Sequence, residues 1–117
     1  MLVFSYGMPN SGVFDSWAAG TELSGLNYLP GMSEKEISRI KEDISRQKQA
    51  GDLIVLSVHW GGNWGYDISE RQQEFAHQLI DQGIVDVIFG HSSHHPMGIE
   101  VYQNKLIIYG AGDFIND

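Results

Sequence analysis

Three histidines fall within five positions of one short segment, Gly90-His91-Ser92-Ser93-His94-His95-Pro96, directly after an apolar run. Imidazole nitrogens bind zinc, manganese, iron and nickel ions well, and a glycine lets the backbone turn closely enough for two rings to face one ion. The spacing therefore indicates a metal site. A hydrated, histidine-rich turn that caps a strand is the alternative, because short motifs also arise by chance.

His59 follows a second apolar run, 53–58, so two separate strand ends would deliver a histidine to the same edge of a sheet. A polar cap bound to a neighbouring carbonyl is the alternative for His59. Asp113, within a Gly-Asp-Phe sequence, is expected to bind the metal, to orient a histidine, or to serve only in a cap or turn. His77 lies among polar residues of an expected helix, and we predict a surface position without a ligand role.

A glycine-rich loop after the second strand is expected to form a wall of the site. Its aromatic residues Trp60, Trp64 and Tyr66 would supply contact area for a ligand. We predict substrate contacts for Trp60, Asn63 and His95. The alternative is that the aromatic rings seal the core beneath this loop.

The composition restricts the class of protein further. With 117 residues, 42% hydrophobic and 19% charged, the chain is long and apolar enough for one domain with a packed core. A formal charge of -8 disfavours nucleic acid as a partner. Because the sequence contains no cysteine, a metal would be held by histidine and oxygen ligands. No apolar stretch approaches the ~20 residues of a membrane span, so we expect these residues to be soluble as they stand.

The elements that must position the histidines can be predicted from periodicity and from helix caps. Two capping boxes, Ser33 with Glu36 and Ser69 with Gln72, mark the starts of helices. The expected order is a strand over 2–6, an ordered surface loop over 7–32, a helix over 33–49, a strand over 53–58, a helix from Ser69 to a stop at Gly83, a strand over 85–89, and a β-hairpin with strands 99–102 and 106–109 around the turn 103–105. This order predicts an α/β fold with a mixed sheet, flanking helices and a ligand site at the strands' carboxyl ends.

Several blocks of the sequence, taken in order, resemble the CapA family, the bacterial capsule or poly-γ-glutamate biosynthesis proteins of the calcineurin-like metallophosphatase superfamily. The blocks are Ser57-Val58-His59-Trp60-Gly61, the run 73–80, Asp86-Val87-Ile88-Phe89-Gly90-His91-Ser92-Ser93-His94, the run 99–102 and Leu106-Ile107-Ile108-Tyr109-Gly110-Ala111-Gly112-Asp113-Phe114. The resemblance implies the C-terminal part of a four-layer α/β/β/α sandwich with a dinuclear metal site.

The same resemblance assigns roles to individual residues. It implies that His59 is the isolated histidine after a core strand and that His91 and His94 belong to the closing histidine motif. Ser92 and Ser93 stand where the family pattern Gly-His-His-Pro-His has a histidine and a proline, which leaves His95 without a defined role. The family's earlier metal-binding blocks have no counterpart here, so we expect residues 1–117 to form a single incomplete domain that is inactive alone.

The leading hypothesis is a metal-dependent phosphoesterase-type domain linked to capsule or poly-γ-glutamate biosynthesis. His59, His91 and His94 would be catalytic, and together with Asp113 they would bind divalent manganese, zinc or iron. The substrate would be a small or polymeric phosphoester or another anion. Full-length family members are often membrane-anchored or extracytoplasmic. The alternatives are a non-catalytic binding or scaffold module that keeps the phosphatase fold, and an ordinary structural module whose histidines never meet.

Overall fold

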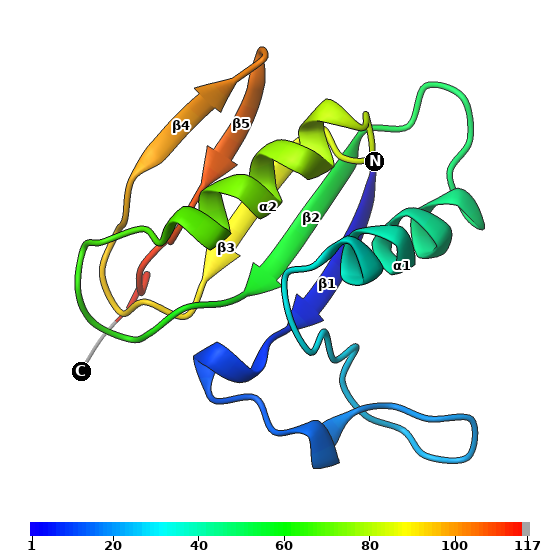
Figure 1. Ribbon diagram of the computed structural model, residues 1–117, viewed down its shortest axis with the longest axis horizontal. Helices are drawn as coiled ribbons and strands as arrows, with labels where there is room; N and C mark the ends of the chain where they lie inside the picture. Colours follow the sequence, from blue (N-terminus) through cyan, green and yellow to red (C-terminus); the bar gives the residue numbers. More distant parts are fainter. Residues whose placement is uncertain (116–117) are drawn as a thin grey trace.

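The computed structural model describes residues 1–115, and these residues form an α/β structure (Figure 1). In chain order the elements are β1 (Leu2–Gly7), the short 3-10 helices η1 (Pro9–Ser11) and η2 (Asp15–Trp17), α1 (Glu34–Ser45), β2 (Ile54–His59), α2 (Glu70–Asp81), β3 (Val87–His91), β4 (Ile99–Tyr102) and β5 (Lys105–Ile108). The predicted fold class, a mixed sheet with helices and a terminal hairpin, is confirmed and is compatible with the C-terminal part of a metallophosphatase-like sandwich. No helix in these 115 residues is long and apolar enough to cross a membrane.

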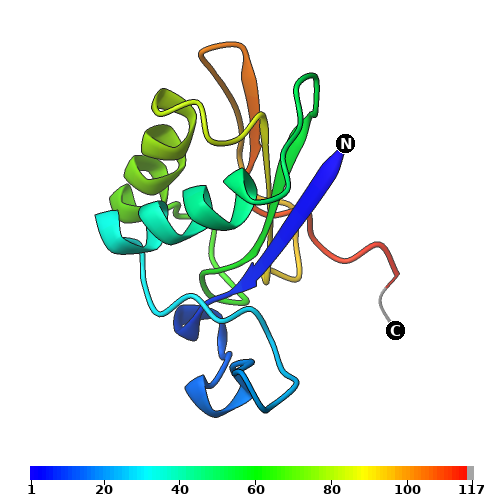
Figure 2. The ribbon, with the colours of Figure 1, turned by 90° about the vertical axis from the view of Figure 1, so that its right-hand side faces the viewer.

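The five strands form one sheet in the order β1-β2-β3-β5-β4. Neighbouring strands are parallel except β4, which pairs antiparallel with β5 through the hairpin. The crossovers through α1 and α2 step in the same direction across the sheet, and because such connections are right-handed, both helices lie on one face. Figure 2 shows the two helices together on one side of the sheet.

The core lies between this face of the sheet and the two helices. Isoleucines at helical spacing on α1 and the apolar stripe of α2 pack over the inward residues of β2, which are Ile54, Leu56 and Val58. Both capping boxes are confirmed: the Ser33 side chain accepts the Lys35 N–H of α1, and its partner Glu36 accepts the Ser33 N–H. The cap at Ser69 has the same reciprocal form.

The opposite face of the sheet has no helix over it in the described part of the chain (Figure 2). Its apolar side chains are exposed or half-buried, with Val3 at 56% and Val101 at 72% exposure. We call this surface the open face; its apolar members are Val3, Val55, Val87, Phe89, Ile99, Val101, Leu106 and Ile108. An uncovered apolar surface of this kind marks a contact surface, as a sandwich with a second sheet requires.

The structure corrects several element boundaries. Helix α1 ends at Ser45 rather than 49, and the chain continues as a hydrogen-bonded turn in which Gln47 N–H donates to the Ile44 carbonyl. Strand β3 is shifted toward the histidine loop and ends at His91 instead of stopping before Gly90. Lys105 begins β5 opposite Tyr102, which leaves a two-residue turn. Both turn residues, Gln103 and Asn104, have positive φ angles, as a type I′ hairpin turn requires.

The predicted ordered loop over 7–32 is tied to the rest of the chain at its far end. Gly7 and Tyr28 form an isolated parallel bridge, and Leu29 is fully buried. The Arg39 guanidinium of α1 donates to the Tyr28 carbonyl and to Asn27. These contacts return the loop to the edge of β1, beside the carboxyl ends of the strands.

Candidate functional site

Two of the predicted site histidines are direct neighbours in the sheet. His59 is the last residue of β2, His91 is the last residue of β3, and the two are in register in the parallel pairing of these strands. Residues in register on parallel strands point to the same face. Both imidazoles therefore project from the open face at the carboxyl edge of the sheet, and the predicted meeting of these two strand ends is confirmed.

The two rings are held in a defined geometry. His59 Nδ1 and His91 Nδ1 are 2.9 Å apart, and His91 Nε2 lies 3.0 Å from the Ser57 hydroxyl, which projects from the same face of β2. Burial lowers the pKa of His59, and burial together with the nearby His59 lowers the pKa of His91. A lowered pKa favours the neutral imidazole, which is the protonation state of a metal ligand.

His94 lies on the loop after β3 and is paired with Asp113. Its Nδ1 is 2.9 Å from Asp113 Oδ2, so this carboxylate orients the ring, which was one of the roles predicted for it. Both residues line a hollow of about 460 Å³ that also contains the histidine pair. The hollow is completed from other segments by Ser11 and Asn63. The predicted position of Asn63 beside the histidines is therefore present, while its substrate contact stays a prediction.

The aromatic residues near the site have different positions. Trp60 is only 2% exposed, stacks on Tyr109 and donates its Nε1–H to the Tyr109 carbonyl, so it belongs to the core and is not available for substrate contact. Trp64 and Tyr66 are exposed, and Trp64 stacks on His94. Neither ring lines the hollow that contains the histidine pair, so of the expected aromatic wall only the contact of Trp64 with His94 borders the site.

His95 does not line the hollow that contains His59, His91 and His94. Its ring packs 4.4 Å from the Tyr66 ring between centroids, its Nδ1 lies 3.2 Å from the Pro96 carbonyl oxygen, and its Nε2 is buried without a partner in the described structure. His77, predicted to be a plain surface residue, is half-buried; it bonds Glu100 and stacks on Tyr102. This contact ties α2 to the hairpin. His77 takes no part in the histidine site, as predicted.

Sequence reasoning missed two serines that support the histidine pair. Ser57 bonds His91, and Ser11 donates from η1 to the His59 carbonyl at 2.9 Å. Ser57 could have been found from the period of two along β2, which places it on the same face as His59. Ser11 could not, because the return of η1 to this strand end is a tertiary contact.

The donor set suits a divalent ion in part. The 2.9 Å separation of the two Nδ1 atoms is compatible with neighbouring ligands of one ion, given metal–nitrogen bonds of about 2.0 to 2.1 Å. In that case the other nitrogen of His91 would donate to Ser57, the kind of outer contact that fixes a ligand ring. Residues 1–115 nevertheless contain no group of three or more histidine, cysteine, aspartate or glutamate side chains arranged to hold a metal. His59 and His91 therefore form an incomplete ligand set.

The fold and the histidine site together restrict the class of protein to which the chain can belong. A mostly parallel sheet whose strand ends present paired histidines on an uncovered apolar face is compatible with the C-terminal part of a metallophosphatase-like sandwich. The family model for the bacterial capsule synthesis protein matches residues 1–117. The chain therefore belongs to this bacterial capsule synthesis protein family.

Individual relatives agree with this assignment. A probable polyglutamine synthesis accessory protein of Mycobacterium tuberculosis is 40% identical over all of this chain and 31% of its own length. The capsule biosynthesis protein CapA of Bacillus anthracis is 32% identical over 91% of this chain and 26% of its own length. The PGA biosynthesis protein CapA of Bacillus subtilis is 32% identical over 83% and 27%, respectively. The chain thus spans less than a third of the length of each of these relatives.

Proposed function

We propose that the full-length protein is a CapA-like, metal-dependent phosphoesterase-type protein in capsule or poly-γ-glutamate biosynthesis, and that this chain supplies His59 and His91 to its metal site. The observation that supports the proposal most directly is the register of the two histidines, which brings their Nδ1 atoms within 2.9 Å. The biosynthetic role is supported by the family and by the names of the relatives, two of which are CapA proteins. The remaining ligands would come from the part of the full-length protein that covers the open face.

Each polar residue of the site would have a distinct task. His59 and His91 would bind the ion through Nδ1, while Ser57 would hold the His91 ring. A divalent ion there would act as a Lewis acid toward a phosphoryl oxygen and would make hydroxide available near neutral pH. His94 would hold or deliver a proton at Nε2, because Asp113 occupies its Nδ1. Asn63 would border the substrate on the other side of the hollow, and Trp64 would support the His94 ring on which it stacks.

Metal analysis of the purified full-length protein, followed by hydrolysis assays with manganese, zinc or iron, tests this proposal. His59→Ala and His91→Ala should each lower the affinity for the ion at least about tenfold and abolish metal-dependent hydrolysis of a phosphoester. His77→Ala is the matched control, since His77 lies on α2 away from the hollow. This control should retain the bound metal and the activity.

Two results would overturn the proposal. Wild-type protein that takes up no divalent ion would remove the metal site. Bound metal without metal-dependent hydrolysis would favour the alternative function, a non-catalytic binding or scaffold module in the assembly of an anionic polymer. The alternative keeps the same fold and the same relatives but needs no proton donor, so under it the His94→Ala variant would bind polymer as well as the wild type.

A further inference from the structure

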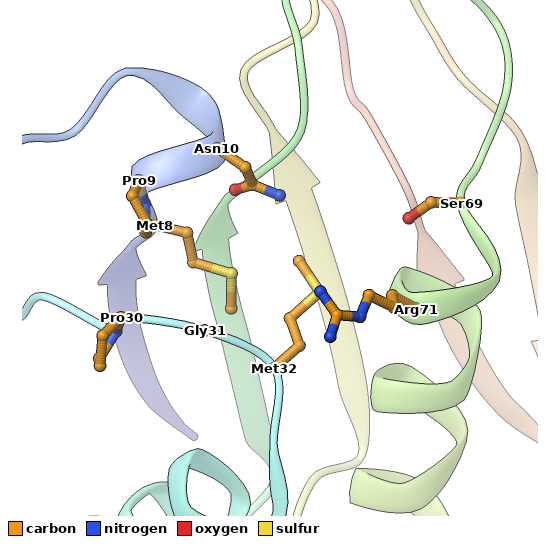
Figure 3. A pocket seen from close by; sticks show the side chains of 8 residues that line it. All are labelled: Met8, Pro9, Asn10, Pro30, Gly31, Met32, Ser69 and Arg71. Carbon is orange, nitrogen blue, oxygen red and sulfur yellow. The ribbon is translucent and has the colours of Figure 1, made fainter.

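A second hollow lies on the helix side of the sheet, where β1 ends and where α1 and α2 begin (Figure 3). Its volume is about 270 Å³, which suits a ligand of the size of an amino acid more than a drug-sized molecule. We call it the arginine hollow, after Arg71 at its rim. Because the open face lies on the other side of the sheet, a layer that covers that face leaves the arginine hollow accessible.

The lining combines an apolar wall with three polar side chains. Met8, which is almost fully buried, and Met32 present their thioethers to the hollow (Figure 3). Asn10, Ser69 and Arg71 point into the same space from three different segments. Arg71 is the one charged residue of this lining, which therefore contains a cation and no carboxylate.

Arg71 differs from the other arginines in having no partner within the described part of the chain. Arg39 bonds the Tyr28 carbonyl and Asn27, and Arg46 forms ion pairs with Glu42 and Asp43, whereas Arg71 makes no hydrogen bond or ion pair there. A cation in the first turn of a helix opposes the helix dipole. Arg71 thus gains nothing from the dipole of α2, and as an exposed cation without a protein partner in the described residues it is available to an anion in the hollow.

The arginine hollow and the histidine site share one structural support, the turn η1. Within this turn, Ser11 lines the histidine hollow and Asn10 lines the arginine hollow. The turn is fixed to β2 by two hydrogen bonds to the His59 carbonyl, one from the Met8 N–H at 3.0 Å and one from the Ser11 hydroxyl at 2.9 Å. The two hollows are therefore bordered by neighbouring residues of the same short turn.

We propose that the arginine hollow is a subsite for a carboxylate on a short aliphatic arm, such as the side chain of a glutamyl unit, next to the histidine site; as an extension of that site, it rests on the proposed function. The guanidinium fork of Arg71 matches both carboxylate oxygens, and the amide of Asn10 offers a further donor. The flexible thioethers of Met8 and Met32 pack on the methylene groups. A single cation beside an apolar wall suits this ligand better than inorganic phosphate, which has no aliphatic part.

Methyl NMR on the metal-free full-length protein, labelled at its methionine methyl groups, tests the subsite with glutarate as the probe. The signals of Met8 and Met32 should shift saturably, whereas that of Met97, which packs beside Gly110, should not. Arg71→Gln should weaken binding at least about tenfold. Arg46→Gln, the same substitution at the exposed residue that follows α1, should leave the affinity unchanged.

The probes and variants separate the outcomes. Equal shifts with pentane-1,5-diol or with inorganic phosphate would overturn the carboxylate subsite, as would glutarate shifts that survive Arg71→Gln. Arg71-dependent glutarate binding in a protein that takes up no divalent ion would support the subsite and refute the proposed function. Metal bound through His59, without any shift at Met8 and Met32, would refute the subsite alone.

Discussion

Replacing Gly90 by alanine should destabilise the protein strongly, because this position has no space for a Cβ atom. Gly90 lies in β3, one residue before His91, and faces the core. An added Cβ would lie 2.5 Å from Trp60 Nε1 and 2.8 Å from the Ile108 carbonyl oxygen, and it would also clash with the Tyr109 carbonyl. Two of these contacts are backbone atoms of the neighbouring strand region, which cannot rotate away.

The magnitude is the sum of two costs, the overpacking of the core and the loss of one buried hydrogen bond. Overpacking of a core costs about 1 to 3 kcal/mol. Displacement of Trp60 also breaks its 3.0 Å bond to the Tyr109 carbonyl, and an unsatisfied buried donor adds about 1 to 3 kcal/mol. We expect a loss of roughly 2 to 6 kcal/mol in the free energy of unfolding. For a chain of this size that loss corresponds to a decrease in Tm of roughly 10 °C or more.

Thermal and urea denaturation followed by circular dichroism measure this loss. Gly20→Ala is the matched control, because nothing lies within 4 Å of its added Cβ and its backbone is not left-handed. That control should stay within about 0.5 kcal/mol of the wild type. A Gly90→Ala protein as stable as the Gly20→Ala protein would refute the steric argument and with it the described placement of Trp60 against β3.

Two further predictions concern a partly buried ion pair and the open face. Burial alone would raise the pKa of Asp86, but the Lys105 ammonium and the Ile54 N–H outweigh it and hold the pKa below its usual range. The stability that Asp86 contributes is therefore present above the unfolded-state pKa of about 3.9 and lost as the pH falls through the folded-state value. Asp86→Asn should cost about 1 kcal/mol at pH 7, and urea titrations in more acidic buffers should show this difference vanishing; a constant difference would contradict the assignment. On the open face, Val101→Asp should reduce self-association of the isolated chain in analytical ultracentrifugation, because Val101 is 72% exposed. Lys41→Asp, on the helix side, should leave the association unchanged.

The sequence predicted the local features well, because local interactions determine them. Each capping box lies within four consecutive residues and satisfies backbone donors of its own helix, so Ser33 and Ser69 could be identified without knowledge of the fold. Gly83 stops α2 with a positive φ angle, as its position indicated. The alternation of strands and helices likewise gave the mixed sheet.

The boundary of β3 shows where local reasoning failed. The glycine at position 90 was expected to end the strand, yet the strand continues to His91 because β2 pairs with it as far as His59 and the Ala111 N–H donates to the Gly90 carbonyl on the other side. Trp60 is a similar case. From the sequence, its indole could lie in solvent or in the core. It can be buried because the Tyr109 carbonyl accepts its N–H, a contact between segments far apart in the chain.

By itself, the sequence determined that two histidines would each stand at the end of an apolar strand, because the strand runs and the residues that follow them are contiguous. Only the tertiary structure decided that β2 and β3 are adjacent and in register, so that His59 and His91 face each other on the open face. It also decided that Asp113 would orient His94 and that η1 would separate the histidine hollow from the arginine hollow. These contacts join segments far apart in the chain, and no local pattern specifies which distant partner a strand end will meet.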